Sequence, residues 1–455
     1  MIQQKTLSFP IKLGISYSVF TFLMYLIGVW NYPNSNRLLL ILLVAIYNIS
    51  MYIGFISGVK RNYVISFHGL GHIDNEPLKD AGLFAWKIYK LCFWSTVVLF
   101  IPRFIIFTGL YNGFDIASIV QRIQYSISNV NEAYMLSHTS GNSATGVWKI
   151  INAFCVFGGG FVWCFTPLVI VFWNKIPRFH RWFAVFYWIV YCIQYIVSAT
   201  NSGVVGQIFY IIMSVVFVQT YKRRHSISIV SKRRSRIHLF LIGIVGIALI
   251  LFVFGFAMSS RVGTNYRDKQ IGTSSITYND ASVFNIMTPE FLHPTVATVD
   301  NYITQGYNAL EMSISLPWEP TFFLGNSRFI MNNFHEITGI DIFNQTYQVR
   351  LFNVTGWHYD IYWHTAYLWL ANDFSLWGLP FFLFILFLYF GTSWRRFIIS
   401  KNIVGYLVIV LFSQFMFYIS ANNTLFSYSD TLLAFIFVGI WMMRSKHYNW
   451  ELFSI

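Results

Sequence analysis

The sequence predicts an all-α, polytopic integral membrane protein, and three observations support this prediction. Of the 455 residues, 56% are hydrophobic, 20% are aromatic and only 11% are charged, a composition that a soluble globule does not have. The apolar residues gather into runs close to the roughly 20 residues that a helix needs to cross about 30 Å of hydrocarbon. Lysine and arginine collect in alternate connections between those runs, as they do in membrane proteins.

Ten apolar runs are predicted to be transmembrane helices. They lie at 13–30, 38–58, 88–110, 150–173, 182–200, 203–220, 237–259, 376–392, 402–420 and 428–443. The chain, 1–455, is thus predicted to be a single membrane domain. Spans one to seven occupy 13–259, one large loop occupies 260–375, and spans eight to ten occupy 376–443. No small-residue cleavage site follows the first run, so we expect a retained anchor.

Basic residues predict the orientation, because segments rich in lysine and arginine resist translocation. With the N-terminus inside, the inside segments hold 21 of the 31 basic residues and the outside segments hold eight. Both termini are therefore predicted to be cytoplasmic, and 260–375 is predicted to face outside. The basic run at 222–236 is a topology signal first and a contact for anionic membrane lipid second. Nucleic-acid binding is not expected, since the net charge of +14 lies at membrane edges.

Metal and nucleotide sites have little support in the sequence. All four cysteines fall within predicted spans and show neither paired external spacing nor a CxxC motif. The chain also lacks a DxD pair, an HExxH motif and a Gly-rich phosphate loop. We therefore expect no disulfide, no metal and no cofactor.

The loop 260–375 is predicted to fold, and to contain amphipathic helices. Between 302 and 374 it carries 17 aromatic residues, too many for a disordered segment. Apolar residues at helical spacing predict an amphipathic helix over 298–315, which Pro317 would end. A second helical stripe, at 357–372, is predicted to lie in the membrane interface or re-enter it.

Carboxylates are concentrated in the same loop. Ten of the 17 Asp and Glu residues lie in 260–375, and the interiors of the predicted spans contain none, apart from Asp430 at an outer end. Ion-driven transporters usually couple through carboxylates within the membrane. The distribution therefore argues against a proton-driven exporter and places the expected chemistry outside.

Several basic residues are candidates for binding an anion. Arg261 and Arg267 directly follow the seventh predicted span, where a guanidinium could bind a pyrophosphate through paired hydrogen bonds. Snorkelling to the interface is an equally good interpretation of both. Arg328 and Arg350 are further loop cations. Arg103 lies inside the third predicted span, where structural pairing competes with substrate contact.

One histidine is a candidate general base. Asp360 precedes His364 by four residues, which predicts both side chains on one helical face. A carboxylate could then orient an imidazole that removes a proton from a sugar hydroxyl. A structural hydrogen bond is the plainer interpretation, and His358 and Asp373 are rival bases. The loop tryptophans, which include Trp357 and Trp363, are expected mainly as an aromatic belt, with one or two stacking on sugar.

Two stretches of the sequence resemble the O-antigen polymerase (Wzy) and oligosaccharide repeat-unit polymerase families. The first is Tyr302-Ile-Thr-Gln-Gly-Tyr-Asn-Ala-Leu310 followed by Leu324-Gly-Asn326. The second is Trp363-His-Thr-Ala-Tyr367 with Asn372-Asp-Phe-Ser-Leu-Trp-Gly378. The expected ten spans and one dominant outer loop also resemble these families.

The resemblance implies a glycosyltransferase of the bacterial inner membrane, with 260–375 as a periplasmic loop. It implies metal-independent transfer of a growing glycan from undecaprenyl pyrophosphate to an incoming lipid-linked repeat unit, yielding O-antigen or capsular-type polysaccharide. The lipid-linked oligosaccharide, membrane lipid and a chain-length regulator protein are the implied partners. The resemblance maps pyrophosphate binding to Arg261, Arg267 and Arg350 and the role of base to His364, which the spacing pairs with Asp360 as a further catalytic candidate. The candidate substrate-binding residues are Arg103, Tyr302, Gln305, Tyr307, Arg328, Trp357, His358, Trp363 and Asp373.

The sequence departs from the family in one respect and leaves three alternatives. Some members carry basic residues in two outer loops, whereas 111–149 has only Arg122 and Lys149. An O-antigen ligase shares the donor and the expected topology. A flippase or other exporter is opposed by the long outer segment. A lipid-sugar glycosyltransferase with an acidic pair in its first outer loop fits poorly, because 31–36 has no carboxylate.

Overall fold

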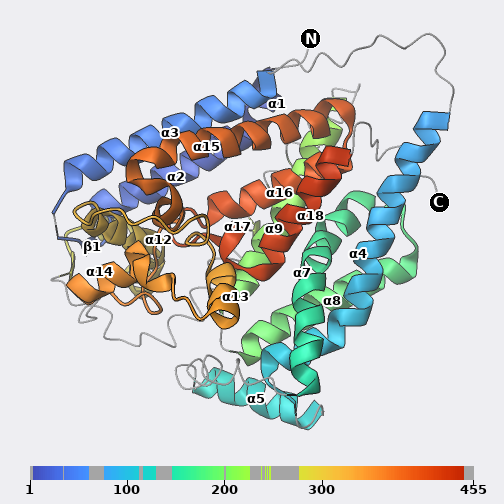
Figure 1. Ribbon diagram of the computed structural model, residues 1–455, viewed down its shortest axis with the longest axis horizontal. Helices are drawn as coiled ribbons and strands as arrows, with labels where there is room; N and C mark the ends of the chain where they lie inside the picture. The colour runs from blue at the N-terminus through green and yellow to red at the C-terminus, as the bar shows by residue number, and fades with distance from the viewer. Residues whose placement is uncertain are drawn as a thin grey trace. The chain divides into compact units, whose positions relative to one another are not determined.

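A computed structural model shows a chain built almost entirely from helices (Figure 1). It describes residues 4–33, 35–60, 76–111, 116–129, 146–198, 201–225 and 276–444, with a few positions between 237 and 246. The strands described are β1 (Trp30–Asn31) and β2 (Thr277–Tyr278), which pair antiparallel. Within the described residues, the fold is therefore all-α apart from this ladder of two short strands that lie far apart in the sequence.

Six described helices are long and apolar enough to cross a membrane. They are Phe9–Ile27 (α2), Arg37–Lys60 (α3), Gly82–Thr108 within α4 (Glu76–Thr108), Val147–Phe172 (α7), Gly203–His225 within α9 (Asn201–His225) and Ala366–Ser400 (α15). The other helices near predicted spans are α8 (Arg178–Val197), α16 (Ile403–Phe417) and α18 (Ser429–Arg444). These helices make the chain a multi-pass membrane protein, and most of the predicted span 237–259 lies outside the described residues.

The chain divides into two compact units. The first comprises Met1–Tyr63, Val262–Arg396 and Leu411–Leu432, and the second comprises Val64–Arg261, Phe397–Val410 and Leu433–Ile455. In the second unit α4 packs along α7, and α8 and α9 pack against each other. The amphipathic α5 (Ile116–Ser128) lies against α8. Most of the described loop residues, and hence most candidate residues, belong to the first unit.

In the first unit, glycines let α3 and α15 approach backbone to backbone. A Cβ atom added at Gly54 or Gly58 would lie 2.3 or 2.2 Å from a carbonyl oxygen of α15. A Cβ atom added at Gly391 would lie 2.1 Å from a carbonyl oxygen of α3. Small residues four apart are the usual device for such close contact between helices in lipid. The glycines therefore pack α3 closely against the part of α15 that follows Ser375.

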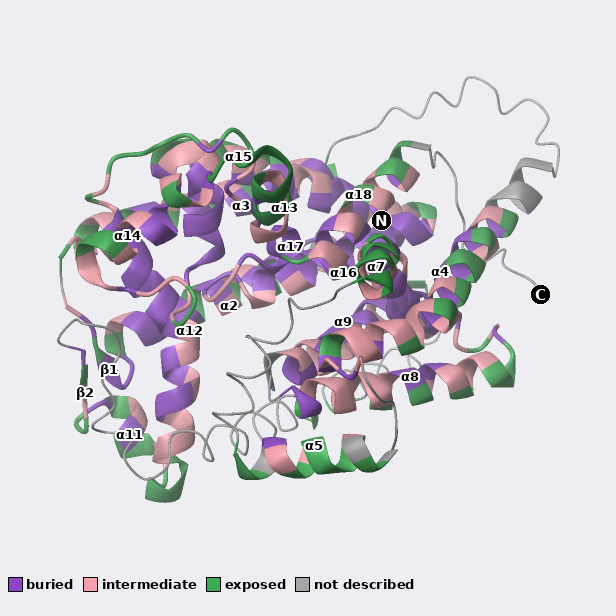
Figure 2. Cartoon of the chain, turned by 60° about the horizontal axis from the view of Figure 1, so that its bottom comes forward, coloured by how far each residue is buried: buried purple, intermediate pink, exposed green. Residues whose placement is uncertain are grey.

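The long loop folds into short helices around one buried helix. The helices and 3-10 turns that follow β2 are α11 (Val283–Met287), η1 (Glu290–Leu292), α12 (His293–Ser313), α13 (Arg328–Thr338), η2 (Phe343–Gln345) and α14 (Tyr347–Thr355). The predicted helix at 298–315 is confirmed as α12, although it is not a surface helix. Every residue from Thr304 to Glu311 is buried, polar ones included, as the purple middle of α12 shows in Figure 2. It packs against α2.

Helix α15 is two helices joined at Ser375. Ser375 has φ 57° and ψ 165°, which no α-helical residue adopts. Its Oγ accepts a hydrogen bond from the backbone N–H of Gly378 at 3.0 Å, so Ser375 caps the second part. That second part begins at Leu376, where the eighth span was predicted to begin. The first part, 366–374, is largely buried within the loop assembly.

The segment before α15 differs from its prediction. A helix was predicted over 357–372, but residues 356–365 are turns and irregular backbone, and α15 begins at Ala366. Thr365 is the reason, because its Oγ1 accepts a hydrogen bond from the N–H of Leu368 at 3.1 Å and so caps the helix. The prediction that Asp360 and His364 share a helical face is therefore wrong.

Candidate functional site

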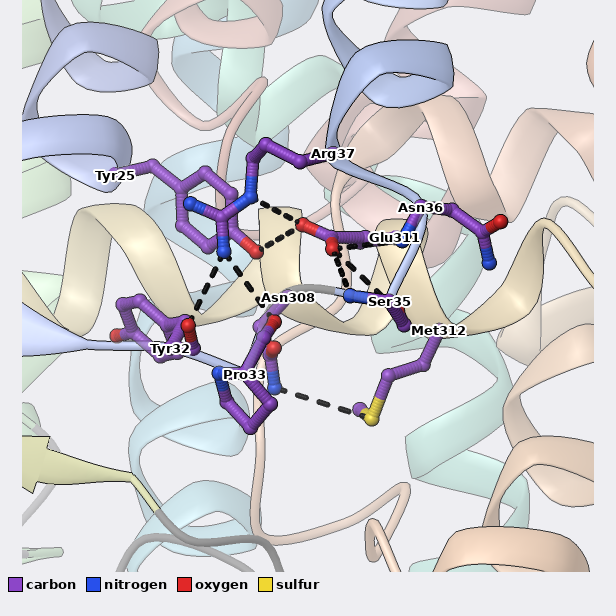
Figure 3. A network of polar contacts seen from close by, with 9 residues as sticks. All are labelled: Tyr25, Tyr32, Pro33, Ser35, Asn36, Arg37, Asn308, Glu311 and Met312. Atoms are coloured by element: carbon purple, nitrogen blue, oxygen red, sulfur yellow. Dashed lines mark hydrogen bonds and ion pairs between the residues drawn. The ribbon is translucent and has the colours of Figure 1, made fainter.

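A carboxylate at the end of α12 ties the loop to the membrane helices (Figure 3). Oε2 of Glu311 accepts hydrogen bonds from the hydroxyl of Tyr25 at 2.7 Å and from Nε of Arg37 at 2.7 Å. Its Oε1 accepts from the backbone N–H groups of Ser35 at 2.8 Å and Asn36 at 3.0 Å. The four donors come from α2, from the α2–α3 connection and from the start of α3. This cluster therefore fixes α12 on the first two spanning helices.

Glu311 is charged in spite of its burial. Burial by itself raises the pKa of Glu311, but the hydrogen bond from Tyr25, the two backbone N–H donors and the charge of Arg37 outweigh it. Together they hold the pKa of this carboxyl below its ordinary value. Since both oxygens are already occupied by donors, Glu311 is a structural ion-pair partner and not a proton carrier.

A second buried carboxylate, Asp300, lies near the beginning of the same helix. Its Oδ2 accepts a hydrogen bond from the backbone N–H of Val29 at 2.6 Å, just past the end of α2. Burial raises the pKa of Asp300 to about 7, against the smaller lowering effect of hydrogen bonds from Val29 and Trp30. Gly28 is required beside it, because an added Cβ would lie 2.4 Å from Oδ2.

The raised pKa of Asp300 predicts that the stability of the folded protein depends on pH. In the unfolded chain this carboxyl titrates near its ordinary 3.8 and in the folded protein near 7, so the folded state binds the proton more tightly. The free energy of unfolding therefore falls as pH rises from about 4 to 7, by up to about 4 kcal/mol. We expect Asp300→Asn to match the parent near pH 4 and to become progressively more stable than the parent up to pH 8, measured by thermal unfolding in detergent. The exposed Asp341→Asn is the control, and an equal effect in both variants would contradict the assignment.

A third carboxylate, Asp373, organises the turn between α12 and α13. It accepts a hydrogen bond from the hydroxyl of Thr321. It also accepts from the backbone N–H groups of Gly325 at 3.2 Å and Asn326 at 3.0 Å, and from Nδ2 of Asn326 at 2.7 Å. These contacts occupy both oxygens. Asp373 therefore positions the 321–326 turn, whereas the sequence suggested a rival base or a substrate contact.

The neighbouring Asn372 extends this contact into a buried polar network. Its Oδ1 accepts from the N–H of Tyr347 at 2.9 Å, and its Nδ2 donates to the Gly325 carbonyl at 2.8 Å and to Oε1 of Gln348 at 3.0 Å. On the other side of the turn, Nδ2 of Asn423 donates to the Asn326 carbonyl at 2.9 Å. The network joins α14, α15 and the 321–326 turn to the beginning of α17 (Thr424–Ser427).

This network carries buried polar atoms that have no hydrogen-bond partner within the described part of the chain. They are Nε2 of Gln348, Oδ1 of Asn423, Oγ1 of Thr424 and Oγ of Ser427. Buried donors and acceptors are normally paired, and each exception calls for an explanation such as a bound ligand or water. A set of donors and acceptors of this kind suits the hydroxyl groups of a sugar, which both donate and accept.

Arg328, at the start of α13, is the cation next to this network. Its Nη2 forms an ion pair with Oδ1 of Asp360, and its guanidinium carbon lies 5.3 Å from the ring centroid of Phe343 and 5.9 Å from that of Trp369. The side chain of Arg328 is 37% exposed. Asp360 thus contacts Arg328, which corrects the expectation that it would orient His364. The aromatic rings lie at the guanidinium and Asp360 occupies Nη2, so the other N–H groups of Arg328 are the ones available for an anion within the described residues.

His364 lies close to Arg328 and is buried. Burial, and then the charge of Arg328, lower the pKa of His364 to about 3, although a hydrogen bond with the backbone of Tyr362 acts in the opposite direction. The imidazole is therefore neutral at physiological pH. Its Nε2 is buried without a hydrogen-bond partner in the described residues, and its ring lies 6.4 Å from that of Trp369. A neutral imidazole with an unpaired Nε2 can accept a proton.

Arg350 is bonded within the loop. Its Nη1 donates to the Pro317 carbonyl at 2.7 Å and to Oε1 of Glu319 at 3.1 Å, and its Nε donates to the Gln345 carbonyl at 3.1 Å. The side chain is 13% exposed. Arg350 therefore holds the 317–319 segment on α14, while its Nη2 is buried without a hydrogen-bond partner in the described residues.

The other candidate residues divide into three groups. Tyr302 lies 5.8 Å from Trp363 between ring centroids, and Gln305 and Trp357 are buried in the same unit. Tyr307 points into the membrane helices, where its hydroxyl lies 3.0 Å from Oγ1 of Thr21. Nδ1 of His358 accepts a hydrogen bond at 3.1 Å from the N–H of Asp360, the ion-pair partner of Arg328. Arg103 belongs to the second unit, where its Nη1 donates to the Cys155 carbonyl at 2.9 Å. Arg261 and Arg267 lie outside the described residues.

A comparison of the chain with protein-family models, with curated proteins and with solved structures finds no match. The site therefore has to be interpreted from its own chemistry. The sequence did not single out Gln348, Asn423 and Thr424, because nothing local to them is unusual. Asn326 and Asn372 did belong to the two stretches on which the resemblance was based, and the structure joins these stretches through Gly325, Asn326 and Asp373.

Proposed function

We propose that this protein is a metal-independent glycosyltransferase that polymerises undecaprenyl-pyrophosphate-linked oligosaccharide repeat units into O-antigen or capsular-type polysaccharide. The proposal depends on the proximity of a partly exposed cation, Arg328, to a buried neutral imidazole, His364. Buried polar groups without hydrogen-bond partners in the described residues, such as Nε2 of Gln348, lie in the neighbouring network. This combination offers one group for a departing diphosphate, one for a proton and several for sugar hydroxyls.

In the proposed reaction, the hydroxyl of an incoming lipid-linked repeat unit attacks the anomeric carbon of the growing glycan. The bond between that carbon and the diphosphate oxygen breaks, the diphosphate leaves with the electron pair, and the hydroxyl proton passes to Nε2 of His364. Arg328 stabilises the charge that develops on the leaving group. The neighbouring Trp369 supplies an aromatic surface next to the cation.

Binding of the donor would also prepare the base. Burial is the largest cause of the low pKa of His364, and the charge of Arg328 is the next. A diphosphate bound to Arg328 offsets that charge, which raises the pKa of the imidazole at the moment when a proton has to be accepted. Arg261, Arg267 and Arg350 remain proposed further contacts for pyrophosphate.

The proposal includes the arrangement expected from the sequence. About ten spans cross the bacterial inner membrane, the loop 260–375 faces the periplasm and both termini are cytoplasmic. The substrate reaches the loop from the membrane as a lipid, and a chain-length regulator is a proposed protein partner. Cysteine labelling of intact cells at exposed loop positions such as Glu336 tests the orientation, and labelling only after the membrane is made leaky would contradict it.

The decisive experiment uses purified protein in proteoliposomes with a lipid-linked repeat unit as the sole substrate. We expect a ladder of products that grows in steps of one repeat and is unaffected by a chelator. Transfer only to an added lipid acceptor, as by a ligase, or movement of the lipid between leaflets without new bonds, as by a flippase, would each refute polymerisation. Loss of the ladder with chelator and its return with a divalent cation would refute metal independence.

A further inference from the structure

The turn 321–326 holds two consecutive aromatic residues in an uncommon backbone conformation. Phe322 has φ 54° and Phe323 has φ 67°, in the left-handed region that residues with a bulky side chain rarely adopt. Such a conformation is unfavourable and persists only where the surroundings impose it. The N–H of Leu324 closes the turn on the Thr321 carbonyl at 3.0 Å.

Asp373 is what imposes this conformation. Its carboxylate receives the hydroxyl of Thr321 before the two phenylalanines and the N–H groups of Gly325 and Asn326 after them. Gly325 cannot be larger, since an added Cβ would lie 2.1 Å from Oγ1 of Thr321. The turn is thus fixed from the inside at both ends.

The fixed turn exposes its apolar side chains. Phe322 is 74% exposed and Phe323 is 70% exposed, although two large neighbouring apolar side chains are rarely left in water without a purpose. The ring of Phe323 lies 5.6 Å from that of Phe374, which in turn stacks on Phe382 at 4.1 Å. Phe382 belongs to the part of α15 that follows Ser375.

That part of α15 has its own exposed apolar face. Trp377, Phe381 and Ile385 follow one another at intervals of four residues and are 61%, 72% and 48% exposed. This face belongs to a helix that is long and apolar enough to span the membrane, and tryptophan is typical of the interface at the end of such a helix. Through Phe374 and Phe382 the turn therefore adjoins the exposed apolar part of a helix that is long and apolar enough to span the membrane.

We propose that the Phe322–Phe323 turn inserts into the interfacial layer of the bilayer that α15 crosses, where its partner is the acyl chains of bulk lipid. Transfer of a phenylalanine side chain from water into an apolar medium is favourable, and this gain offsets the conformational cost of the turn. The insertion would also fix the depth of Arg328 in the membrane, because Arg328 lies just after the turn at the start of α13. Arg328 would thereby be kept near the lipid phosphates. The inference depends on α15 spanning the membrane and is independent of glycosyl transfer.

Spin labels test this insertion in proteoliposomes. In a variant lacking the four native cysteines, single nitroxides are placed at positions 322 and 323, at Ile385 as the lipid reference and at the exposed Glu336 of α13 as the aqueous reference. The measurement is the ratio of collision with oxygen, which partitions into lipid, to collision with a water-soluble nickel chelate. We expect the ratio at 322 and 323 to approach that at Ile385 and to exceed that at Glu336 several-fold.

A second variant separates insertion from simple hydrophobicity of the probe. Asp373→Asn weakens the turn, so we expect the ratio at 322 to shift towards the aqueous reference while the ratio at Ile385 stays constant. The proposal is overturned if labels at 322 and 323 match Glu336, which would place the turn in water. It is equally overturned if both collision agents are excluded, which would place the turn against protein.

Discussion

Glu311→Ala is expected to remove most of the folded protein from the membrane. The substitution leaves the guanidinium of Arg37, which is only 19% exposed, without its carboxylate, and it leaves the N–H groups of Ser35 and Asn36 without their acceptor. Breaking a buried ion pair from one side costs about 3–5 kcal/mol, a large part of the 5–15 kcal/mol that typically stabilises a folded protein. The measurements are the protein level in membranes and the unfolding temperature in detergent.

A matched pair in the same loop supplies the control. Glu319 also forms an ion pair with an arginine, Arg350, but its side chain is 49% exposed. We expect Glu319→Ala to cost about 1 kcal/mol or less, as exposed pairs do. Glu311→Gln, which keeps the shape and one acceptor oxygen, should fall between the two alanine variants. Equal losses in Glu311→Ala and Glu319→Ala would show that the Glu311 cluster does not hold the loop in place.

Arg328→Ala is expected to reduce polymerisation by about 10²–10³-fold, the range seen when one stabiliser of developing charge is removed. The protein should still fold, because the Arg328 side chain is 37% exposed and its partner Asp360 is 50% exposed. Arg328→Lys keeps the charge but not the planar fork, so its rate should lie between those of the parent and the alanine variant. The measurement is the initial rate of ladder formation in proteoliposomes at equal amounts of folded protein.

Two further variants separate catalysis from stability. If His364 and Arg328 act in one step, His364→Gln should lower the rate comparably, and the double variant should be hardly slower than the slower single one. Arg350→Ala should also lower the unfolding temperature, because Arg350 is bonded to the Pro317 and Gln345 carbonyls, so its rate is compared at equal amounts of folded protein. Parental turnover in Arg328→Ala would eliminate the proposed site.

The elements that could be predicted are those whose signal is local. Continuous apolar runs located α2, α3 and α7, and the predicted start of the eighth span near Leu376 lies next to the break in α15 at Ser375. The spacing in 298–315 identified α12, although not its burial. The error at Asp360 and His364 came from assuming a helix across the pair, when Thr365 was a local signal for a helix that begins only at Ala366.

The contacts that could not be predicted join residues far apart in the chain. Glu311 and Arg37 are separated by 274 positions, and Asp373 and Asn326 by 47. The sequence around each of these residues does not indicate its partner, because any of several carboxylates could have paired with any of several donors. The same holds for Arg328 and His364, which the fold brings together from two sides of the loop.

The interruption at Ser375 gives α15 a hinge between its two helical parts. Bilayers of different thickness tilt a spanning helix by different amounts, and a continuous helix would transmit that tilt along its whole length. Here the helical backbone is interrupted at Ser375, between the apolar part that follows it and the part that carries Trp369, Asn372 and Asp373. A change in the tilt of the part after Ser375 can be absorbed by rotation about the backbone of Ser375. The distances among Trp369, Asn372 and Asp373 then stay constant when the bilayer thickness changes.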